Sequence, residues 1–569
     1  MHQLLLRAAA SLLLLLPLVP NVAAEPLPRP IEQLLRRQLP ASPKGVKTIT
    51  TPNNVTVRYK EPGSEGVCET TPGVKSYSGY VDLDESTHMF FWFFEARKNP
   101  DKAPITLWLN GGPGSDSLIS LFSAIGPCNV TANGTSVLNP YSWTEESNML
   151  FLSQPVGVGF SYQNKIHGTY DNNTGVATNS SNPTGRFSGI QNDYTTDTTA
   201  LAAVTAWEVM QAFFGTLPRL DPTVKSRRFH LWTESYGGHW GPGFYRHFYE
   251  QNERIRNGTI TGGRGVQLEM ESLGIINGLI SPRIQYPLLP EFARNNTYGI
   301  SVDDFTYNAM KLNLEFPGGC KSAIDNCILL GHSTPQGVTL CASAHFMCQN
   351  LVVSLFAQLG GRDNYDIRAK ANADIPPTYW MDYLNTARVQ DALGVDLNYT
   401  NNFNIGVNLA FGLQGDQVRD TTFHDLEWIL EKGVRVALIY GDADFICNWV
   451  GGEAVSLALQ WPNATSFAKA GYAPFTLAGD SHGNKTYGDT RQYRGLSFTR
   501  VYEAGHIVPY YQPAASLELF KRVLHNRVLA GGGDVQVSPI FESHGSANAT
   551  ATNSGWDQGA MFTGRPGDW

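Results

Sequence analysis

The amino-acid sequence predicts an α/β fold, with a central mixed and mostly parallel sheet and helices packed against it. Three short apolar runs read as buried strands, and each ends abruptly in glycine or polar residues: Ile105–Leu109, Phe229–Trp232 and Leu273–Ile280. Just before the second run, residues 193–214 carry apolar side chains at helical spacing, which indicates a helix. Strand–helix–strand order of this kind builds a parallel sheet.

The first residues have the pattern of a secretory signal peptide. Arg7 precedes a short apolar run at 11–19, and the small residues Ala23 and Ala24 follow. The run is too short to span a bilayer comfortably, so a membrane anchor is the less favoured alternative. We therefore expect a signal peptide over 1–24, a linker or short pro-segment over 25–52, and a secreted, extracellular protein without a stable membrane anchor.

Composition and cysteine usage agree with secretion. The chain is 42% hydrophobic and 16% charged with a formal charge of -8, which gives no reason to expect nucleic acid as a partner. Seven cysteines leave at least one thiol unpaired, and in an oxidising compartment the others are expected in disulfides. No Cys/His spacing fits a structural zinc site, and no metal or cofactor is predicted. Sequons for N-glycosylation occur at Asn54, Asn129, Asn133, Asn172, Asn179, Asn257, Asn295, Asn398, Asn463, Asn484 and Asn548.

Changes in pattern divide the rest of the chain into segments. Residues 53–281 and 431–530 carry the strand signals and are predicted to form the two parts of one core. Residues 282–430 show helical segments and a cluster of four cysteines, and are predicted as a largely helical insertion over the sheet. The cysteine spacing suits two nested bridges without fixing their connectivity. Residues 163–190 are predicted as a long glycosylated loop, and 531–569 as a flexible tail.

Ser235 ends the second strand in the stretch Thr233-Glu-Ser-Tyr-Gly237. A small residue two positions before a serine and a glycine two positions after it are typical of a nucleophile elbow, the sharp turn that exposes a serine hydroxyl. Thr233 stands where the pattern usually has glycine. On this stretch alone, an ordinary strand–turn–helix is therefore an equal alternative.

The first strand runs directly into Asn110-Gly-Gly-Pro-Gly114. Glycine-rich backbone can fold so that N–H groups point into a cavity, and an oxyanion hole needs such donors. A plain tight turn is the alternative interpretation of this pentapeptide.

Two more polar residues follow predicted strands, Asp444 in Gly441-Asp-Ala-Asp444 and His506 in Ala504-Gly-His506. The chain order Ser, Asp, His is that of the α/β-hydrolase fold, which we therefore predict. His506 would take the proton of the Ser235 hydroxyl, and Asp444 would orient the imidazole. On sequence grounds Asp442 competes with Asp444 for the role of the acid.

Four motifs in this order resemble those of the serine carboxypeptidases, peptidase family S10: Trp108-Leu-Asn-Gly-Gly-Pro-Gly114, Thr233-Glu-Ser-Tyr-Gly-Gly238, Gly441-Asp-Ala-Asp-Phe-Ile-Cys-Asn-Trp449 and Ala504-Gly-His-Ile-Val-Pro509. Two further stretches, Cys68-Glu-Thr-Thr-Pro-Gly73 and Phe93-Phe-Glu-Ala-Arg97, are most similar to the secreted fungal carboxypeptidase S1 branch. The resemblance covers roughly residues 66–527. It implies a hydrolase that removes C-terminal residues from peptides or proteins through an acyl-enzyme.

The resemblance implies a role for each matching residue. The catalytic triad matches Ser235, Asp444 and His506, and the oxyanion-hole donors match the backbone N–H groups of Gly112 and Tyr236. The site for the substrate carboxylate matches Asn110, Gly111 and Glu234. The pocket lining matches Ile446, Cys447 and Ile507, of which Cys447 also matches a buried free thiol. The implied disulfides are Cys320–Cys348, Cys327–Cys341 and, as the remaining pair, Cys68–Cys128.

The chain also departs from the family pattern. Ser115-Asp116-Ser117 stands where the family usually has Cys-Ser-Ser, and the cysteine that bridges this turn to the insertion is absent near Asn401. The family Asp before Gln-Pro-Val is Ser153. A second carboxyl group, which in the family pairs with the Glu before the nucleophile, aligns with Ala124. We therefore hypothesise a weakened selection for a free C-terminal carboxylate.

Three functions are compatible with the residues. The leading hypothesis is a secreted serine carboxypeptidase, with apolar side chains preferred beside the scissile bond. The second is a carboxypeptidase-like acyltransferase or esterase, motivated by Ala124 and by the Ser115–Ser117 departure. The third is a catalytically silent binding glycoprotein, against which the intact triad argues. A lipase is weaker still, because nothing in 282–430 resembles an amphipathic lid. The sequence makes no prediction about oligomeric state.

Overall fold

The computed structural model describes residues 39–171, 176–181, 183–189, 196–260, 265–400, 402–477 and 485–547. The signal peptide expected at 1–24 lies outside these residues, as do the sequons at Asn172, Asn484 and Asn548.

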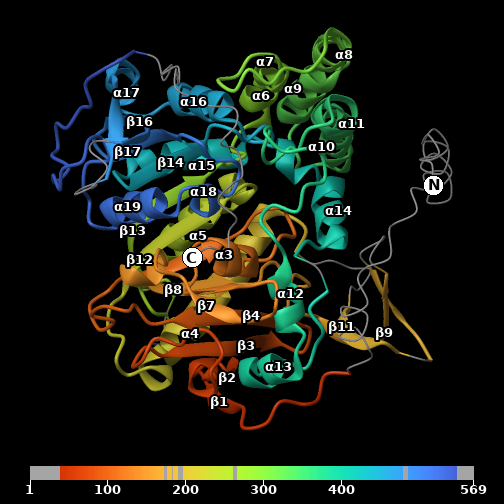
Figure 1. Cartoon of the computed structure of the whole chain (residues 1–569), viewed down its shortest axis with the longest axis vertical. Helices are drawn as coiled ribbons and strands as arrows, with labels where there is room; N and C mark the ends of the chain where they lie inside the picture. The colour runs from red at the N-terminus through yellow and green to blue at the C-terminus, as the bar shows by residue number, and fades with distance from the viewer. Residues whose placement is uncertain are drawn as a thin grey trace. The chain divides into compact units, whose positions relative to one another are not determined.

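A twelve-stranded mixed sheet forms the centre of the described chain (Figure 1). Its order is β1-β2-β3-β4-β8-β5-β12-β13-β14-β17-β16-β15. The strands are β1 (Lys47–Thr50), β2 (Thr56–Lys60), β3 (Ser76–Asp84), β4 (Thr87–Phe94), β5 (Ile105–Leu109), β8 (Asn148–Leu152), β12 (Arg228–Glu234), β13 (Glu269–Ile276), β14 (Arg435–Gly441), β15 (Tyr472–Thr476), β16 (Thr486–Tyr493) and β17 (Leu496–Val501). A separate pair is formed by β6 (Cys128–Val130) and β7 (Ser136–Leu138).

The middle of the sheet is parallel. Strands β8, β5, β12, β13, β14 and β17 pair in parallel, and the strands on either side of them are antiparallel. Every residue of β5, β8, β14 and β17 is buried, which explains why their sequences are mostly apolar. Because parallel strands share one direction, their carboxyl ends lie along one edge, where a ligand site is expected.

Helices from both parts of the core pack on this sheet. α4 (Thr199–Leu220) begins where the side chain of Thr198 caps it by accepting a hydrogen bond from Leu201 N–H. It packs against α5 (Gly237–Arg256), which also contacts α15 (Thr421–Glu431). The remaining core helices are α3 (Leu118–Ser123), α16 (Trp449–Ala458), α17 (Ala464–Lys469), α18 (Val508–Tyr511) and α19 (Pro513–Leu524).

The segment between β13 and β14 is rich in helices, and Figure 1 shows α6 to α11 grouped together. Disulfides Cys320–Cys348 and Cys327–Cys341 join α9 to α10, the pairs that the family resemblance implies. The helices are α6 (Pro282–Gln285), α7 (Leu289–Arg294), α8 (Asp304–Glu315), α9 (Cys320–Leu330), α10 (Pro335–Cys348), α11 (Ser354–Gly360), α12 (Tyr379–Leu384), α13 (Ala387–Leu393), α14 (Ile405–Gln414) and α15 (Thr421–Glu431).

By length and composition alone, two helical stretches of the described residues could cross a membrane, Thr199–Leu220 and Pro335–Gly360. The first is α4, a core helix that packs on α5 and on the sheet. The second is tied to α9 by both disulfides just named.

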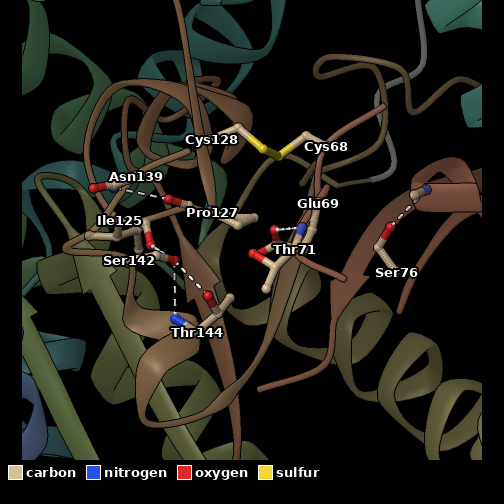
Figure 2. The surroundings of a disulfide bond; sticks show 12 residues. Cys68, Glu69, Thr71, Ser76, Ile125, Pro127, Cys128, Asn139, Ser142 and Thr144 are labelled. Carbon is tan, nitrogen blue, oxygen red and sulfur yellow. Dashed lines mark hydrogen bonds between the residues drawn. A yellow bond between two sulfur atoms is a disulfide. The ribbon is translucent and has the colours of Figure 1, made fainter. Parts of the chain in front are cut away.

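The third disulfide, Cys68–Cys128, joins one of the two stretches that resemble the S1 branch, Cys68–Gly73, to the start of β6 (Figure 2). Beside it, Glu69 Oε1 accepts a hydrogen bond from Thr71 N–H at 2.6 Å. Arg97 Nε donates to Glu69 Oε2 at 3.0 Å, and its Nη2 donates to the carbonyl of Pro127 at 3.0 Å. Glu69 and Arg97 therefore form a buried ion pair that braces this disulfide.

Three segments differ from the sequence-based expectation. Residues 163–190, expected as a loop, contain the antiparallel strands β9 (Asn164–Asp171), β10 (Val176–Asn179) and β11 (Gly185–Gly189). The expected linker contributes β1, which pairs with β2. Residues 531–547, expected as flexible tail, pack on the sheet, where Ser543 donates a hydrogen bond to the carbonyl of Gly471 at 2.7 Å. The polar composition of these segments gave no sequence signal for strands, because the backbone hydrogen bonds that pair strands do not require apolar side chains.

Candidate active site

Ser235 lies on the turn between β12 and α5 with φ of 65°, a left-handed conformation that is strained for a residue with a Cβ. Its N–H donates to the carbonyl of Ile276 at 3.0 Å. Its own carbonyl accepts from the N–H groups of Gly238 and Leu279, both at 2.9 Å. These bonds hold the strained turn against the end of β13, and the geometry is that of a nucleophile elbow.

The elbow tolerates Thr233 in place of the usual glycine because of Gly237. A Cβ at position 237 would lie 2.5 Å from the Cβ of Thr233. Thr233 Oγ1 also donates a hydrogen bond to the carbonyl of Gly237 at 2.8 Å. Strand and helix therefore approach so closely that only one of the two positions can carry a side chain.

The glycine turn at 110–114 touches the elbow from the neighbouring strand. A Cβ at Gly111 would lie 2.3 Å from the backbone nitrogen of Tyr236, so only glycine allows this approach. Gly112 has φ of 104°, which also favours glycine. Gly112 and Tyr236 line the same cavity as Ser235, which brings together the backbone groups predicted as oxyanion-hole donors.

Asp444 and His506 form a buried pair at the ends of β14 and β17. His506 Nδ1 and Asp444 Oδ2 lie 2.7 Å apart. Burial raises the pKa of Asp444, although the nearby imidazole opposes the shift. Burial alone would lower the pKa of His506, but the charge and hydrogen bond of Asp444 outweigh it, so this pKa is raised. His506 Nε2 has no hydrogen-bond partner among the described residues.

Asn277 supports this pair, and the sequence analysis missed it. Its Nδ2 donates to Asp444 Oδ2 at 2.8 Å, and its Oδ1 accepts from Gly441 N–H at 3.0 Å. The sequence feature that could have revealed Asn277 is its position directly after the last residue of β13. The competing acid, Asp442, instead bonds Arg500 Nη2 at 3.3 Å and the hydroxyl of Tyr298.

By distance alone, one group of metal-ligating side chains stands out in the described part of the chain. The ligand atoms of Asp444, Cys447 and His506 lie within 4.8 Å of one another. Hydrogen bonds from Asn277 and from the N–H of Cys447 already reach Asp444 Oδ2, at 2.8 and 3.3 Å. The group therefore fits a buried hydrogen-bonded pair better than an open metal site.

A cavity of about 560 Å³ opens over these residues, a size suited to a short peptide end. Ser235 and His506 line it together, although no hydrogen bond joins them directly. The pocket residues predicted from the resemblance also line it: Ile446, Cys447 and Ile507. Cys447 is a buried free thiol whose pKa is raised well above its ordinary value by burial.

Glu234 and Asn110 line this cavity together with Ser235. Asn110 Nδ2 donates to Glu234 Oε1 at 2.9 Å, and Trp108 Nε1 fixes the amide by donating to Asn110 Oδ1 at 2.8 Å. Glu234 Oε2 has no hydrogen-bond partner in the described chain. Burial raises the pKa of Glu234 to about 7. Ala124 is buried and contributes no carboxyl group.

Hydrogen bonds join the glycine turn to the insertion, where the family has a cysteine bridge. Ser115 forms a β-bridge with Phe403. Asp116 N–H donates to the carbonyl of Asn402 at 2.9 Å, and Asn404 N–H donates to the carbonyl of Gly114 at 2.8 Å. The departure at 115–117 therefore leaves the turn attached to the insertion.

The described sequons differ in exposure. The side chains at Asn54, Asn133, Asn179, Asn257 and Asn295 are exposed, and those at Asn129, Asn398 and Asn463 are partly buried. Asn398 Oδ1 also accepts a hydrogen bond from Arg186 N–H at 2.9 Å. Most of the described sequons are thus on the surface, where a glycan can be attached.

Residues 62–526 match the family model for serine carboxypeptidases, peptidase S10. The chain belongs to the serine carboxypeptidase family. Carboxypeptidase S1 homolog B from Arthroderma otae is 38% identical over 538 residues, which cover 88% of this chain and 80% of the relative. Carboxypeptidase S1 from Penicillium janthinellum is 35% identical over 468 residues, which cover 82% of this chain and 99% of the relative.

A solved structure supports the same fold for this carboxypeptidase. Kex1Δp, described as a prohormone-processing carboxypeptidase from Saccharomyces cerevisiae, matches with a TM-score of 0.62 at 22% identity. The match covers 81% of this chain and 93% of that one. The predicted α/β-hydrolase fold and the predicted hydrolase class are therefore confirmed, and peptides are the substrates of the family.

Proposed function

We propose that this carboxypeptidase is secreted and releases C-terminal residues from peptides or proteins through an acyl-enzyme formed on Ser235. The observation that carries the proposal is the convergence of four strand ends, those of β5, β12, β14 and β17, at one cavity. The strained Ser235 elbow, the Asn110 turn and His506 border that cavity, and Asp444 lies behind His506 at 2.7 Å.

The proposed reaction follows from the roles of these groups. His506 Nε2 takes the proton of the Ser235 hydroxyl as its oxygen attacks the last peptide carbonyl. Asp444 keeps the proton of the imidazole on Nδ1 and stabilises the imidazolium. The imidazolium then protonates the leaving amine, and the C-terminal residue departs. Water, activated by His506, hydrolyses the remaining ester and restores Ser235.

The oxyanion that forms in each step needs donors that are already in place. The backbone N–H groups of Gly112 and Tyr236 are proposed to supply them, because both residues border the cavity beside Ser235. The close packing of Gly111 on Tyr236 fixes the spacing between the two donors.

Glu234 is proposed to recognise the substrate carboxylate as a neutral acid. Its pKa of about 7 means that it carries a proton at mildly acid pH. A protonated carboxyl group can donate a hydrogen bond to the terminal carboxylate, together with Asn110 and the backbone of Gly111. Burial alone can thus provide the neutral acid that a second carboxyl group would otherwise help to maintain.

The deciding experiment is mass spectrometry of peptide libraries after incubation with the purified protein. Stepwise loss of residues from C-termini is expected for the wild type and not for Ser235→Ala. A serine-directed phosphonylating reagent should label the wild type on Ser235 in parallel. Peptides that remain intact despite labelling of Ser235 would contradict peptidase activity.

An acyltransferase or esterase is the second candidate. It is favoured by Glu234 Oε2, which has no hydrogen-bond partner among the described residues, and by the buried Ala124, which offers no second carboxyl group. Comparison of a blocked dipeptide acid with its methyl ester and amide separates the two. A carboxypeptidase that selects the free carboxylate should prefer the acid at pH 5. Equal or better turnover of ester and amide at that pH would favour the second candidate.

Secretion is proposed from the apolar N-terminal run, the sequons and the three disulfides. Expression in a secreting host should yield glycosylated protein in the medium. Intracellular retention of unglycosylated protein would contradict this part of the proposal.

A further inference from the structure

A short segment of the insertion, residues 363–368, packs directly on His506. The carbonyl of Tyr365 accepts a hydrogen bond from His506 N–H at 2.8 Å. The two rings also lie together, with centroids 4.9 Å apart. A Cβ at Gly505 would lie 2.6 Å from the carbonyl oxygen of Tyr365, so a glycine is needed for the loop to come this close.

The same segment also binds the loop that carries Asp444. The carbonyl of Asn364 accepts hydrogen bonds from Phe445 and Ile446 N–H, at 3.2 and 3.0 Å. On the other side of Asp444, the carbonyl of Ala443 accepts from Ile367 N–H at 2.9 Å. One short stretch of backbone therefore holds both members of the catalytic pair proposed above.

Asp363 gives this segment its shape. Its Oδ1 accepts hydrogen bonds from Tyr365 N–H at 2.8 Å and from Asp366 N–H at 3.2 Å. A side-chain oxygen that bonds the backbone two and three residues on folds the chain into an Asx-type turn. This turn presents the carbonyls of Asn364 and Tyr365 to the two catalytic loops.

Arg368 anchors the far end of the segment. Its backbone N–H and its Nε donate to Asp366 Oδ1, at 3.0 and 2.8 Å. The guanidinium carbon lies 5.4 Å from the ring centroid of Tyr298 and 5.2 Å from that of Tyr511. These contacts hold the guanidinium against two aromatic rings and so anchor the C-terminal end of the turn at 363–366.

We propose that Asp363 is a positioning residue for catalysis: its turn holds the Tyr365 carbonyl and ring against His506 and the Asn364 carbonyl against the Asp444 loop. The proposal rests on the proposed function, in which His506 and Asp444 act on Ser235. It adds a residue of the insertion to an apparatus otherwise built from the ends of the sheet strands.

The pKa of His506 distinguishes the effect of the Asp363 charge from the effect of the Asp363 turn. The carboxyl groups that face the imidazole come from three elements: Asp444 after β14, Glu234 at the end of β12, and Asp363 in the insertion. Burial lowers the pKa of His506, and all three carboxylates raise it. Loss of the Asp363 charge should therefore lower this pKa, whether or not the turn is kept.

The matched variants are Asp363→Asn and Asp363→Ala. Asparagine keeps an oxygen that can accept both backbone hydrogen bonds but has no charge, whereas alanine removes both. We expect Asp363→Ala to lower kcat about 10- to 100-fold with little change in KM, as misplacement of a catalytic group does. Asp363→Asn should recover most of kcat. Both variants should move the acid limb of kcat/KM to lower pH, while exposed Asp101→Ala should behave as the wild type.

The outcomes separate the inference from the proposed function. Equal kcat for Asp363→Asn and Asp363→Ala would overturn the role of the turn. If Asp363→Ala does not fold, as judged by circular dichroism and thermal melting, the pair Tyr365→Ala and Tyr365→Phe decides. A kcat that falls in Tyr365→Ala but stays near the wild-type value in Tyr365→Phe supports the inference. Equal kcat values for these two variants overturn it. A wild type that neither cleaves peptides nor reacts with the phosphonylating reagent would overturn the proposed function itself.

Discussion

Tyr399 donates a hydrogen bond of 2.9 Å from its hydroxyl to Asp116 Oδ2, which joins the insertion to the turn that carries Gly112. Asp116 is fully buried, and Ser153 Oγ donates to its other oxygen at 2.7 Å. The carboxylate therefore ties three segments together at a place where no cysteine pair is available. Because it is buried, each of its oxygens needs a partner.

Removal of the Tyr399 hydroxyl should weaken this junction. Tyr399→Phe leaves Asp116 Oδ2 without that donor, at a cost of about 1–3 kcal/mol in the free energy of unfolding. Urea unfolding at pH 7 measures the change, with exposed Tyr379→Phe as the control. A fall in kcat/KM of several-fold should accompany it, because the turn positions Gly112. A variant as stable and as active as the control would contradict this role.

Asp116 should also make stability depend on pH. Burial raises its pKa from 3.8 to about 6. Between these values the folded protein binds the proton more tightly than the unfolded chain, so the stabilisation by protonation is lost as pH rises from about 4 to about 6. Asp116→Asn has no such proton. The unfolding free energy of the wild type minus that of the variant should therefore fall over this window, on the order of 1–3 kcal/mol. A constant difference from pH 4 to 7 would refute the assignment.

Glu234 should set the pH range in which the free carboxylate is selected. Its pKa, raised to about 7 by burial, makes it a neutral donor below pH 7 and a repelling carboxylate above it. KM for a blocked dipeptide acid should therefore rise about tenfold from pH 6 to pH 8, whereas KM for the methyl ester should stay level. Glu234→Gln should remove the rise, because the amide cannot ionise. The same pH dependence in the glutamine variant would assign the titration to another group.

The core strands could be predicted because their signals are local, and the proposed triad rests on signals of the same kind. A strand buried on both faces is mostly apolar, and a polar side chain follows its end, as Ser235 follows β12. Asp116 and Tyr399 are 283 residues apart, so no local pattern could reveal their hydrogen bond. Asp363 was missed for the same reason, because its turn contacts His506 only in the folded chain. Strands β9 to β11 were missed because their polar sequences lack the apolar alternation that marks a half-buried strand.

The elbow offers a test of two residues together. Gly237→Ala would place a methyl group 2.5 Å from the Cβ of Thr233, so overpacking should cost about 1–3 kcal/mol and lower kcat. Thr233→Gly removes the obstructing side chain. In the double variant the two changes should compensate, giving a coupling energy of about 1 kcal/mol or more in a double-mutant cycle of unfolding free energies. Strictly additive effects on the unfolding free energy would mean that the side chains at 233 and 237 do not clash in the Gly237→Ala variant.

The charge of the cavity predicts a preference among substrates. The carboxylates of Asp363 and Asp374 line it, and no Lys or Arg does so among the described residues. In contrast to the apolar preference expected from the sequence, peptides with a lysine next to the scissile bond should thus be cleaved at least as fast as apolar ones, most clearly at low salt. Asp374→Asn, which removes an exposed charge, should lower kcat/KM for the lysine peptide about 2- to 5-fold. The matched leucine peptide should change little. An equal loss for both peptides would show that Asp374 acts on the cavity's shape instead of its charge.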